Sequence, residues 1–283
     1  MINVDKLCFS YSKHASFISG MDFQVQNGEV FGFLGPSGAG KSTVQKIMTG
    51  ILKEYKGSVR ILNTEVKSSK RDFYQHIGVD FEFPNLYGKF TALENLKFFS
   101  SLYDHRGYDL MELLERVGLK SDADKKVSDF SKGMKMRLSF IRAIAHKPKV
   151  IFLDEPTSGL DPVNARIIKD MILEQKSEGK SILLTTHNMH DAQELCDKVA
   201  FIVDGSIKVI DTPDNLRLKK GGSTVTYTYN ESGTRHSAKA PLDYLYENRE
   251  FMSRLAGRQV ISIHSDEQTL EDIFIEVTGR CLS

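Results

Sequence analysis

The stretch GPSGAGKST, Gly35 to Thr43, restricts the fold of this chain more than any other part of the sequence. An apolar run at residues 30–34 predicts a buried strand before it, and a helix is expected after it, from about Lys41 to Leu52. Glycines at such a turn let backbone N–H groups surround phosphates, and the helix N-terminus adds positive potential. The loop is therefore predicted to bind a nucleoside triphosphate through Gly35, Pro36, Ser37, Gly38, Ala39, Gly40, Lys41, Ser42 and Thr43.

A second motif, VIFLDE at residues 150–155, supplies the acidic half of such a site. Its apolar residues predict a buried strand, and the carboxylates follow at the C-terminal end, where open α/β sheets bind ligands. We expect Lys41 to reach the β- and γ-phosphates, and Ser42 and Asp154 to hold Mg²⁺. Glu155 is placed to accept a proton from the attacking water. These two motifs therefore predict a nucleoside triphosphate and Mg²⁺ as cofactors, and the resemblance stated below implies that the nucleotide is ATP.

The order of patterns along the chain indicates a mostly parallel α/β core with a helical insertion. Strand patterns such as SILLTTH, residues 181–187, alternate with helix patterns, and residues from about 83 to 147 are mainly helical in character. After Asn215 the composition shifts to Lys, Gly, Ser and Thr, and TVTYTY predicts a strand. We therefore expect one domain at residues 1–218 and a small α+β accessory domain at residues 219–283.

Composition excludes several classes of protein. A formal net charge of +1 argues against a protein that coats nucleic acid. The three cysteines, Cys8, Cys196 and Cys281, have no metal-ligand spacing, which is typical of reduced thiols. No apolar segment follows a basic start, and no window approaches about 18 uninterrupted apolar residues. Any contact with a membrane is therefore expected to go through a partner.

The motifs in their order resemble the ATP-binding subunit of an ABC transporter. SGLD, residues 158–161, follows the acidic motif at once, and TTH ends the next strand. The resemblance covers residues 1 to about 215. It implies an α/β fold of the P-loop NTPase (RecA-like) class, with an antiparallel β subdomain, a helical signature subdomain and the small C-terminal α+β appendage.

The resemblance also implies roles for single residues. Tyr11 corresponds to the aromatic residue that stacks on adenine, although an exposed strand aromatic is the alternative. His187 corresponds to the switch histidine that contacts the γ-phosphate, and Asp161 lies in the segment that crosses the dimer interface. Glu82 stands where the family usually has glutamine, near Mg²⁺ and the attacking water. Its added negative charge predicts slower hydrolysis or a tighter Mg²⁺ dependence.

The family's signature, usually Leu-Ser-Gly-Gly-Gln, corresponds here to FSKGM, residues 130–134. Ser131 and Gly133 are retained. In the family such residues bind the γ-phosphate of ATP held by the opposite subunit, so the resemblance implies a head-to-tail pair of ATP-binding subunits. Lys132 departs from the pattern, and the sequence leaves open whether it points to solvent or to the phosphates.

The leading hypothesis is an ATP-hydrolysing subunit that dimerises and drives a separate transmembrane permease from the cytoplasmic face of the membrane. The segment at residues 84–96 would line the groove that receives the permease. LEDIFIEVTGR, residues 270–280, resembles the end of ATPases that serve ABC-2-type exporters, which favours export and leaves the substrate open. Whether two identical or two different ATP-binding subunits pair is also open.

Two alternatives belong to other classes. One is an ATPase of the same superfamily that acts on DNA or ribosomes; the absence of sustained heptads between the two motifs disfavours it, as does the balanced charge. The other is a non-hydrolysing ATP sensor, in which Glu82 and Lys132 would mark decay. Intact residues at positions 41, 154, 155 and 187 argue against the sensor.

Overall fold

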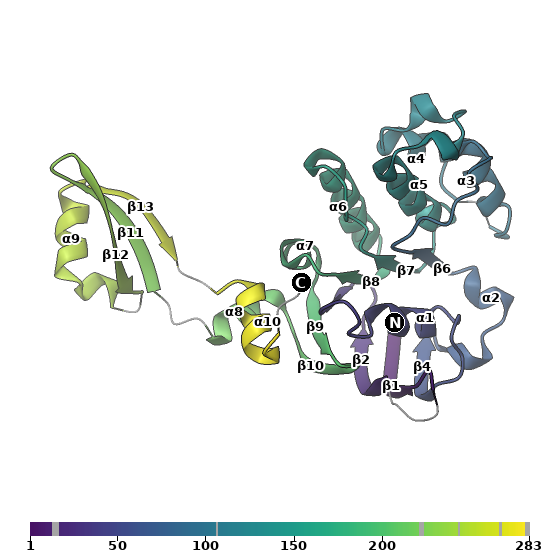
Figure 1. The fold of residues 1–283 in the computed structure, drawn as a ribbon, viewed down its shortest axis with the longest axis horizontal. Coiled ribbons are helices and arrows are strands. Elements are labelled where there is room, and N and C mark those ends of the chain that lie inside the picture. The colour runs from purple at the N-terminus through teal and green to yellow at the C-terminus, as the bar shows by residue number, and fades with distance from the viewer. Residues whose placement is uncertain (13–16, 106, 221–223, 243, 266–267, 281–283) are drawn as a thin grey trace. The chain divides into compact units, whose positions relative to one another are not determined.

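The computed structural model of the chain divides into two units, Met1–Thr212 and Pro213–Cys281 (Figure 1). It describes residues 1–12, 17–105, 107–220, 224–242, 244–265 and 268–280, so Cys281 lies outside the described residues. Within these residues, no helix combines the length and the apolar character that crossing a membrane requires. The two units are described in turn.

A six-stranded sheet forms the centre of the first unit, in the order β10-β9-β3-β8-β7-β6. Its five neighbouring strands β9, β3, β8, β7 and β6 pair in parallel, and β10 is antiparallel to β9. The three central strands are buried along their whole length, as expected for a sheet covered on both faces. The six strands of this sheet are Val30–Leu34 (β3), Ile77–Asp80 (β6), Val150–Asp154 (β7), Ser181–Thr186 (β8), Lys198–Val203 (β9) and Ser206–Asp211 (β10). The predicted α/β core is confirmed.

A smaller antiparallel sheet, in the order β2-β1-β4-β5, shares a hydrophobic core with the first helix and the central sheet. Residues that point into this core alternate along β1 and β2, which is the pattern of a sheet with one buried face. The strands are Ile2–Phe9 (β1), Ile18–Val25 (β2), Lys56–Ile61 (β4) and Thr64–Glu65 (β5). This sheet is the predicted antiparallel β subdomain.

Two helices of the first unit begin at residues with local start signals. Thr91 and Glu94 form a capping box at the start of α3, and Asp161 caps α6 with Pro162 as its first residue. Helix α1 ends at Met48 rather than near Leu52, because the chain leaves the helix through a left-handed residue at Gly50 (φ 74°). The helices are α1 (Lys41–Met48), α2 (Arg71–Tyr74), α3 (Ala92–Ser100), α4 (Leu110–Arg116), α5 (Lys132–Ile144), α6 (Pro162–Ser177) and α7 (Met189–Leu195).

The second unit is a small α+β structure with its own core. Three antiparallel strands in the order β12-β11-β13 carry alternating side chains, and Tyr227, Tyr229 and Ala240 pack with Phe251 of helix α9. Helix α8 already belongs to this unit, so the division lies before residue 219. The elements are α8 (Pro213–Lys220), β11 (Thr224–Glu231), β12 (Thr234–Pro241), α9 (Arg249–Ala256), β13 (Val260–Ser265) and α10 (Leu270–Thr278).

His146 joins the end of α5 to the edge of the central sheet. Its Nε2 lies 2.9 Å from the carbonyl oxygen of Ile77, to which the neutral ring donates, and its ring stacks on Tyr103 with centroids 3.6 Å apart. Nδ1 is buried without a hydrogen-bond partner. Burial lowers the pKa of His146 to about 4, so the ring stays neutral in the folded protein at neutral pH.

Acid should therefore destabilise the protein partly through His146. The unfolded chain binds a proton near the ordinary pKa of 6.5, whereas the folded chain binds it only near pH 4, so stability is lost as pH falls through this window. Between pH 7 and pH 5 the free energy of unfolding of the wild type should fall by about 2 kcal/mol more than that of His146→Gln. Urea unfolding at both pH values measures this difference, and equal losses in the two proteins would refute the assignment.

Candidate functional site

The phosphate-binding loop lies between β3 and α1, as the motif predicts. Gly40 precedes α1 with φ 110°, a conformation that favours glycine, and a side chain at Gly35 would meet the carbonyl oxygen of Ile202 at 2.2 Å. The ammonium of Lys41 donates to the carbonyl oxygens of Gly35 and Pro36, at 2.5 and 3.1 Å. The lysine is thus held at the mouth of the loop, next to the N-terminus of α1.

Burial lowers the pKa of Lys41, and three carboxylates oppose this shift with their negative charge: those of Glu155, Asp154 and Glu82. These charges come from two separate segments of the chain, namely the end of β7 with the residue after it, and the loop after β6. The electrostatic coupling shows that the fold brings the acidic residues predicted from the sequence close to the lysine of the loop.

Two threonines at the end of β8 hold the two carboxylates of the acidic motif. The parallel register sets Asp154 opposite Thr185, and the Thr185 hydroxyl donates to the Asp154 carboxylate. The Thr186 hydroxyl donates to Oε2 of Glu155 at 3.2 Å, and Nδ1 of His187 lies 2.7 Å from Oε1. Neither threonine was assigned a role from the sequence, because a threonine at the end of a buried strand has no local signature.

Glu155 has an unusual backbone. Its φ is 52°, in the left-handed region that residues with a side chain rarely adopt. Its N–H donates to the carbonyl oxygen of Thr185 at 2.9 Å, and its side chain is only 12% exposed. His187 is 61% exposed on the other side of their contact. Backbone strain of this kind persists only where the surroundings fix it, and it is often found at functional sites.

One cavity of about 330 Å³ gathers most of the predicted residues. Its predicted lining residues come from the glycine-rich loop and from the segments that carry the carboxylates and the histidine. They are Ser37, Gly38, Ala39, Gly40, Lys41, Ser42, Thr43, Glu82, Asp154, Glu155 and His187. Phe17 and Ser158 also line it and were not predicted.

Tyr11 lies beside this cavity without lining it. Its hydroxyl is 2.9 Å from Oγ1 of Thr43, its ring packs edge-on against Phe17 with centroids 5.4 Å apart, and it is 60% exposed. Two aromatic rings therefore stand together where the loop opens. Phe17 lies just before β2 and outside any motif, so only the three-dimensional structure associates it with Tyr11.

The residues predicted to serve a partner's nucleotide lie elsewhere on the chain. Ser131 caps α5, and its hydroxyl accepts from the Met134 N–H at 3.2 Å. Asp161 caps α6, is exposed, and accepts from Val163 N–H and Asn164 N–H. Neither residue lines the cavity, and nor does Gly133.

Lys132 lies over the segment that follows the acidic motif. Its side-chain atoms are 3.5–4.0 Å from the position that a Cβ of Gly159 would occupy, and a Cβ on Gly133 would meet Leu160 at 3.5 Å. Within one chain, the start of α5 therefore packs directly on the SGLD segment. Lys132 points to this segment and not to the chain's own phosphate loop.

The donor set of the cavity suits Mg²⁺. The Ser42 hydroxyl and the carboxylates of Asp154 and Glu82 line the same cavity, and hard oxygen ligands are those that Mg²⁺ prefers. The Thr185 hydroxyl holds one of these carboxylates in place. The residues present therefore fit a metal bound together with nucleotide phosphates.

Fold and site together define a P-loop ATPase of the α/β class. The family described as ABC transporter matches residues 18–158. A fluoroquinolones export ATP-binding protein of Mycobacterium tuberculosis is 48% identical over 285 residues, covering 100% of this chain and 95% of that protein. A Nod factor export ATP-binding protein I of Burkholderia pseudomallei is 35% identical over 280 residues, covering 93% of this chain and 92% of the relative.

Solved structures agree with the sequence relatives. An ATP-binding subunit of an ABC transporter matches with a TM-score of 0.71 and 27% identity, covering 89% of this chain and 99% of that one. A Clostridium perfringens protein, part of an ABC transporter complex, matches with a TM-score of 0.66 and 27% identity over 77% of this chain and 91% of its own. The chain belongs to the ATP-binding subunits of the ABC transporter family. It binds ATP and is an ATPase, which favours the transport hypothesis over the sensor and nucleic-acid alternatives.

Replacing Glu82 with glutamine should speed hydrolysis several-fold and change its dependence on Mg²⁺. The carboxylate contributes negative charge to a cavity that receives the phosphates, and the amide keeps the oxygen donor without that charge. Steady-state ATP turnover across a Mg²⁺ titration measures both effects. If turnover and Mg²⁺ dependence both stayed as in the wild type, Glu82 would have no place in the site.

Proposed function

We propose that this protein is the ATP-hydrolysing subunit of an exporter, in which Glu155 and His187 form the unit that activates water. The observation that carries the proposal is the 2.7 Å contact between the two side chains at the edge of the cavity that holds the phosphate loop. A carboxylate with two positioning donors can accept the proton of an attacking water. His187, exposed beyond this contact, is free to reach the γ-phosphate.

The remaining roles follow from the cavity. Lys41 and the N–H groups of the loop bind the β- and γ-phosphates, and Ser42, Asp154 and Glu82 would hold Mg²⁺. The metal, when bound, neutralises the charge of the phosphate oxygens. Tyr11, with Phe17 beside it, offers an aromatic surface for the adenine ring.

A second ATP-binding subunit, facing head to tail, would complete each site. Ser131 and Gly133 stand at the start of the thirteen-residue helix α5, where the free N–H groups and the helix dipole attract anions. Asp161 stands at the start of α6, exposed toward such a partner. The contact of Lys132 and Gly133 with the SGLD segment joins these elements within one chain. Binding of the nucleotide would then be coupled to pairing of the two subunits.

A separate transmembrane permease would dock in the hollow between the central sheet and the helical part. This cavity of about 580 Å³ is lined by Phe81, Asn85, Leu86, Tyr87 and Phe99 among others, and Phe83 beside it is 73% exposed. Exposed aromatic residues gathered at one place indicate an interaction surface. The protein would thus be held at the cytoplasmic face of the membrane by its permease.

The first test is the Glu155→Gln variant of the purified chain. Turnover of ATP should fall by about 10²-fold or more, because the amide cannot accept a proton, while the affinity for ATP is retained. With hydrolysis blocked, ATP should convert the variant from monomer to dimer in size-exclusion chromatography, and ADP should not. Wild-type turnover equal to that of Glu155→Gln, even with the permease present, would end the proposal.

The direction of transport is tested in cells. Both named relatives are export subunits, one for fluoroquinolones, and this chain matches that relative over its full length. Cells that lack the protein should accumulate more fluoroquinolone, and the wild type but not Glu155→Gln should reverse this. If expressing the wild type left fluoroquinolone accumulation unchanged, fluoroquinolones would be excluded as the substrate. Transport into inside-out membrane vesicles, driven by ATP, would then decide between export and import.

A further inference from the structure

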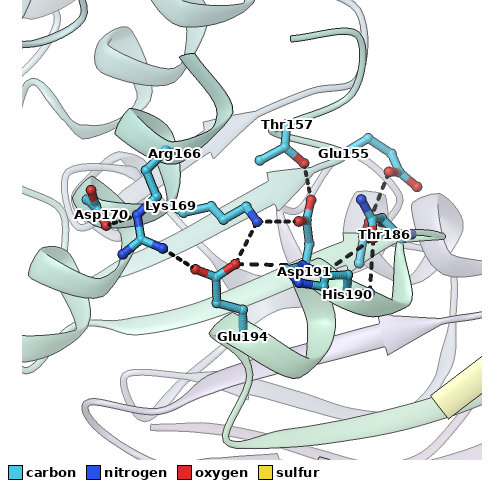
Figure 2. A network of polar contacts seen from close by, with 10 residues as sticks. Glu155, Thr157, Arg166, Lys169, Asp170, Thr186, His190, Asp191 and Glu194 are labelled. Atoms are coloured by element: carbon cyan, nitrogen blue, oxygen red, sulfur yellow. Dashed lines mark hydrogen bonds and ion pairs between the residues drawn. The ribbon is translucent and has the colours of Figure 1, made fainter. Parts of the chain in front are cut away.

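Helices α6 and α7 share a network of ion pairs with a buried centre, shown in Figure 2. The ammonium of Lys169, on α6, lies 2.7 Å from Oδ1 of Asp191 and 2.6 Å from Oε2 of Glu194, both on α7. The side chains of Lys169 and Asp191 are only 11% and 6% exposed. A buried lysine of this kind persists only where carboxylates compensate its charge.

The network alternates cations and carboxylates. Arg166 donates to the other oxygen of Glu194 at 2.7 Å, so two cations face the two carboxylates of α7, and Asp170 pairs with Arg166 at the exposed edge. Burial alone would lower the pKa of Lys169, but its hydrogen bonds to the two carboxylates outweigh burial and raise it. His190, Asp191 and Glu194 could together ligate a metal by their spacing, yet the lysine ammonium is the cation between these carboxylates.

One branch of the network reaches the backbone that follows the general base. Oδ2 of Asp191 accepts from the Thr157 hydroxyl at 2.5 Å. Thr157 belongs to the turn after β7, in which the Ser158 N–H donates to the carbonyl oxygen of Glu155 at 3.0 Å. The strained φ of Glu155 begins this turn. Fixing Thr157 therefore fixes the segment that orients Glu155.

A second branch reaches the side chain of the general base. Asn188 caps α7 by accepting from the N–H groups of His190 and Asp191, at 3.0 and 3.2 Å. The Asn188 N–H donates to the Thr186 hydroxyl at 3.0 Å, and this hydroxyl donates to Glu155. Figure 2 shows Thr186 and Glu155 on the side of Asp191 away from Lys169. The start of α7 is thus connected to both the backbone and the carboxylate of Glu155.

We propose that Thr157, Asp191 and Lys169 are positioning residues for ATP hydrolysis, which set the orientation of Glu155 through the turn at residues 155–158. The proposal rests on the proposed role of Glu155 as the general base. None of the three touches the nucleotide cavity as a lining residue. They act because α6 follows the SGLD segment and α7 follows His187, and the buried lysine ties these two helices together.

The network also gives the site a connection to the opposite subunit. Helix α6 begins at Asp161, in the segment that would meet the partner, and carries Lys169 two turns later. Helix α7 follows His187. A displacement of the SGLD segment on pairing would move α6, and Lys169 would transmit that movement to Asp191 and Thr157. The geometry of Glu155 would then depend on whether the partner is present.

A pair of substitutions at Thr157 tests the hydrogen bond itself. Thr157→Val keeps the shape of the side chain and removes its hydroxyl, whereas Thr157→Ser keeps the hydroxyl. Under single-turnover conditions, the purified full chain with Thr157→Val should hydrolyse ATP about tenfold more slowly or worse, since small displacements of a catalytic group have large effects. Its affinity for ATP should stay within about twofold of the wild type, and Thr157→Ser should restore the rate.

A matched control separates positioning from stability. Thr269→Val removes a similar hydrogen bond to a carboxylate, the 2.7 Å bond to Asp272 in the second unit, and should lower the melting temperature without slowing single-turnover hydrolysis. Asp191→Asn keeps an acceptor for Thr157 but loses the charge for Lys169, so its hydrolysis rate should lie between those of wild type and Thr157→Val.

The outcomes separate the two proposals. A wild-type rate in Thr157→Val, with folding shown by circular dichroism, would overturn the positioning role while leaving Glu155 as the base. A rate that fell in proportion to melting temperature in every variant, the control included, would also overturn it. Wild-type turnover no higher than that of Glu155→Gln would instead remove the proposed function, and the positioning role with it.

Discussion

The register of three buried parallel strands is the constraint on which the rest of the site depends. Leu34 of β3 pairs with Thr186 of β8, and Asp154 of β7 pairs with Thr185, so all three strands end at one level. The phosphate loop, two threonines and two carboxylates emerge there together. A slip of one residue would turn Asp154 away from its threonine, because side chains alternate between the faces of a sheet.

Local signals were sufficient for the elements that build this edge. The glycine-rich loop and the acidic motif involve residues close in sequence, and the structure has the loop before α1 and the strand before Glu155 where they were predicted. The caps at Thr91 and Asp161 are local in the same way. Phe17 and Thr186 could not be recognised in this way. Their roles arise from pairing between segments distant in the chain, and a single sequence carries no record of such pairing. The early end of α1 has a local cause, the left-handed Gly50.

Lys132 illustrates how tertiary structure resolves a position that the sequence leaves open. A lysine in the first turn of a helix is unfavourable to the helix dipole, so a chance substitution there would be expected to turn its charge into solvent. The end of its exposed side chain, Nζ included, lies on Gly159, where the absence of a side chain makes room. The substituted signature thus retains a contact with the segment after the acidic motif.

Two kinds of interaction hold Glu155, the proposed general base, and they belong to different parts of the fold. The N–H of Glu155 donates to Thr185 of β8, so this contact is lost only when the central sheet itself opens. The Glu155 side chain accepts from the Thr186 hydroxyl, which in turn accepts from Asn188 at the start of α7. The turn after it is held by Asp191 of α7, whose carboxylate also pairs with Lys169 of α6. Buried ion pairs are sensitive to small changes in distance, because the charges have little solvent to replace a lost partner. In the proposed mechanism, the sheet holds the backbone of Glu155 and the two helices adjust the turn and the side chain. If the subunits pair as proposed, a subunit that is alone would hydrolyse ATP slowly.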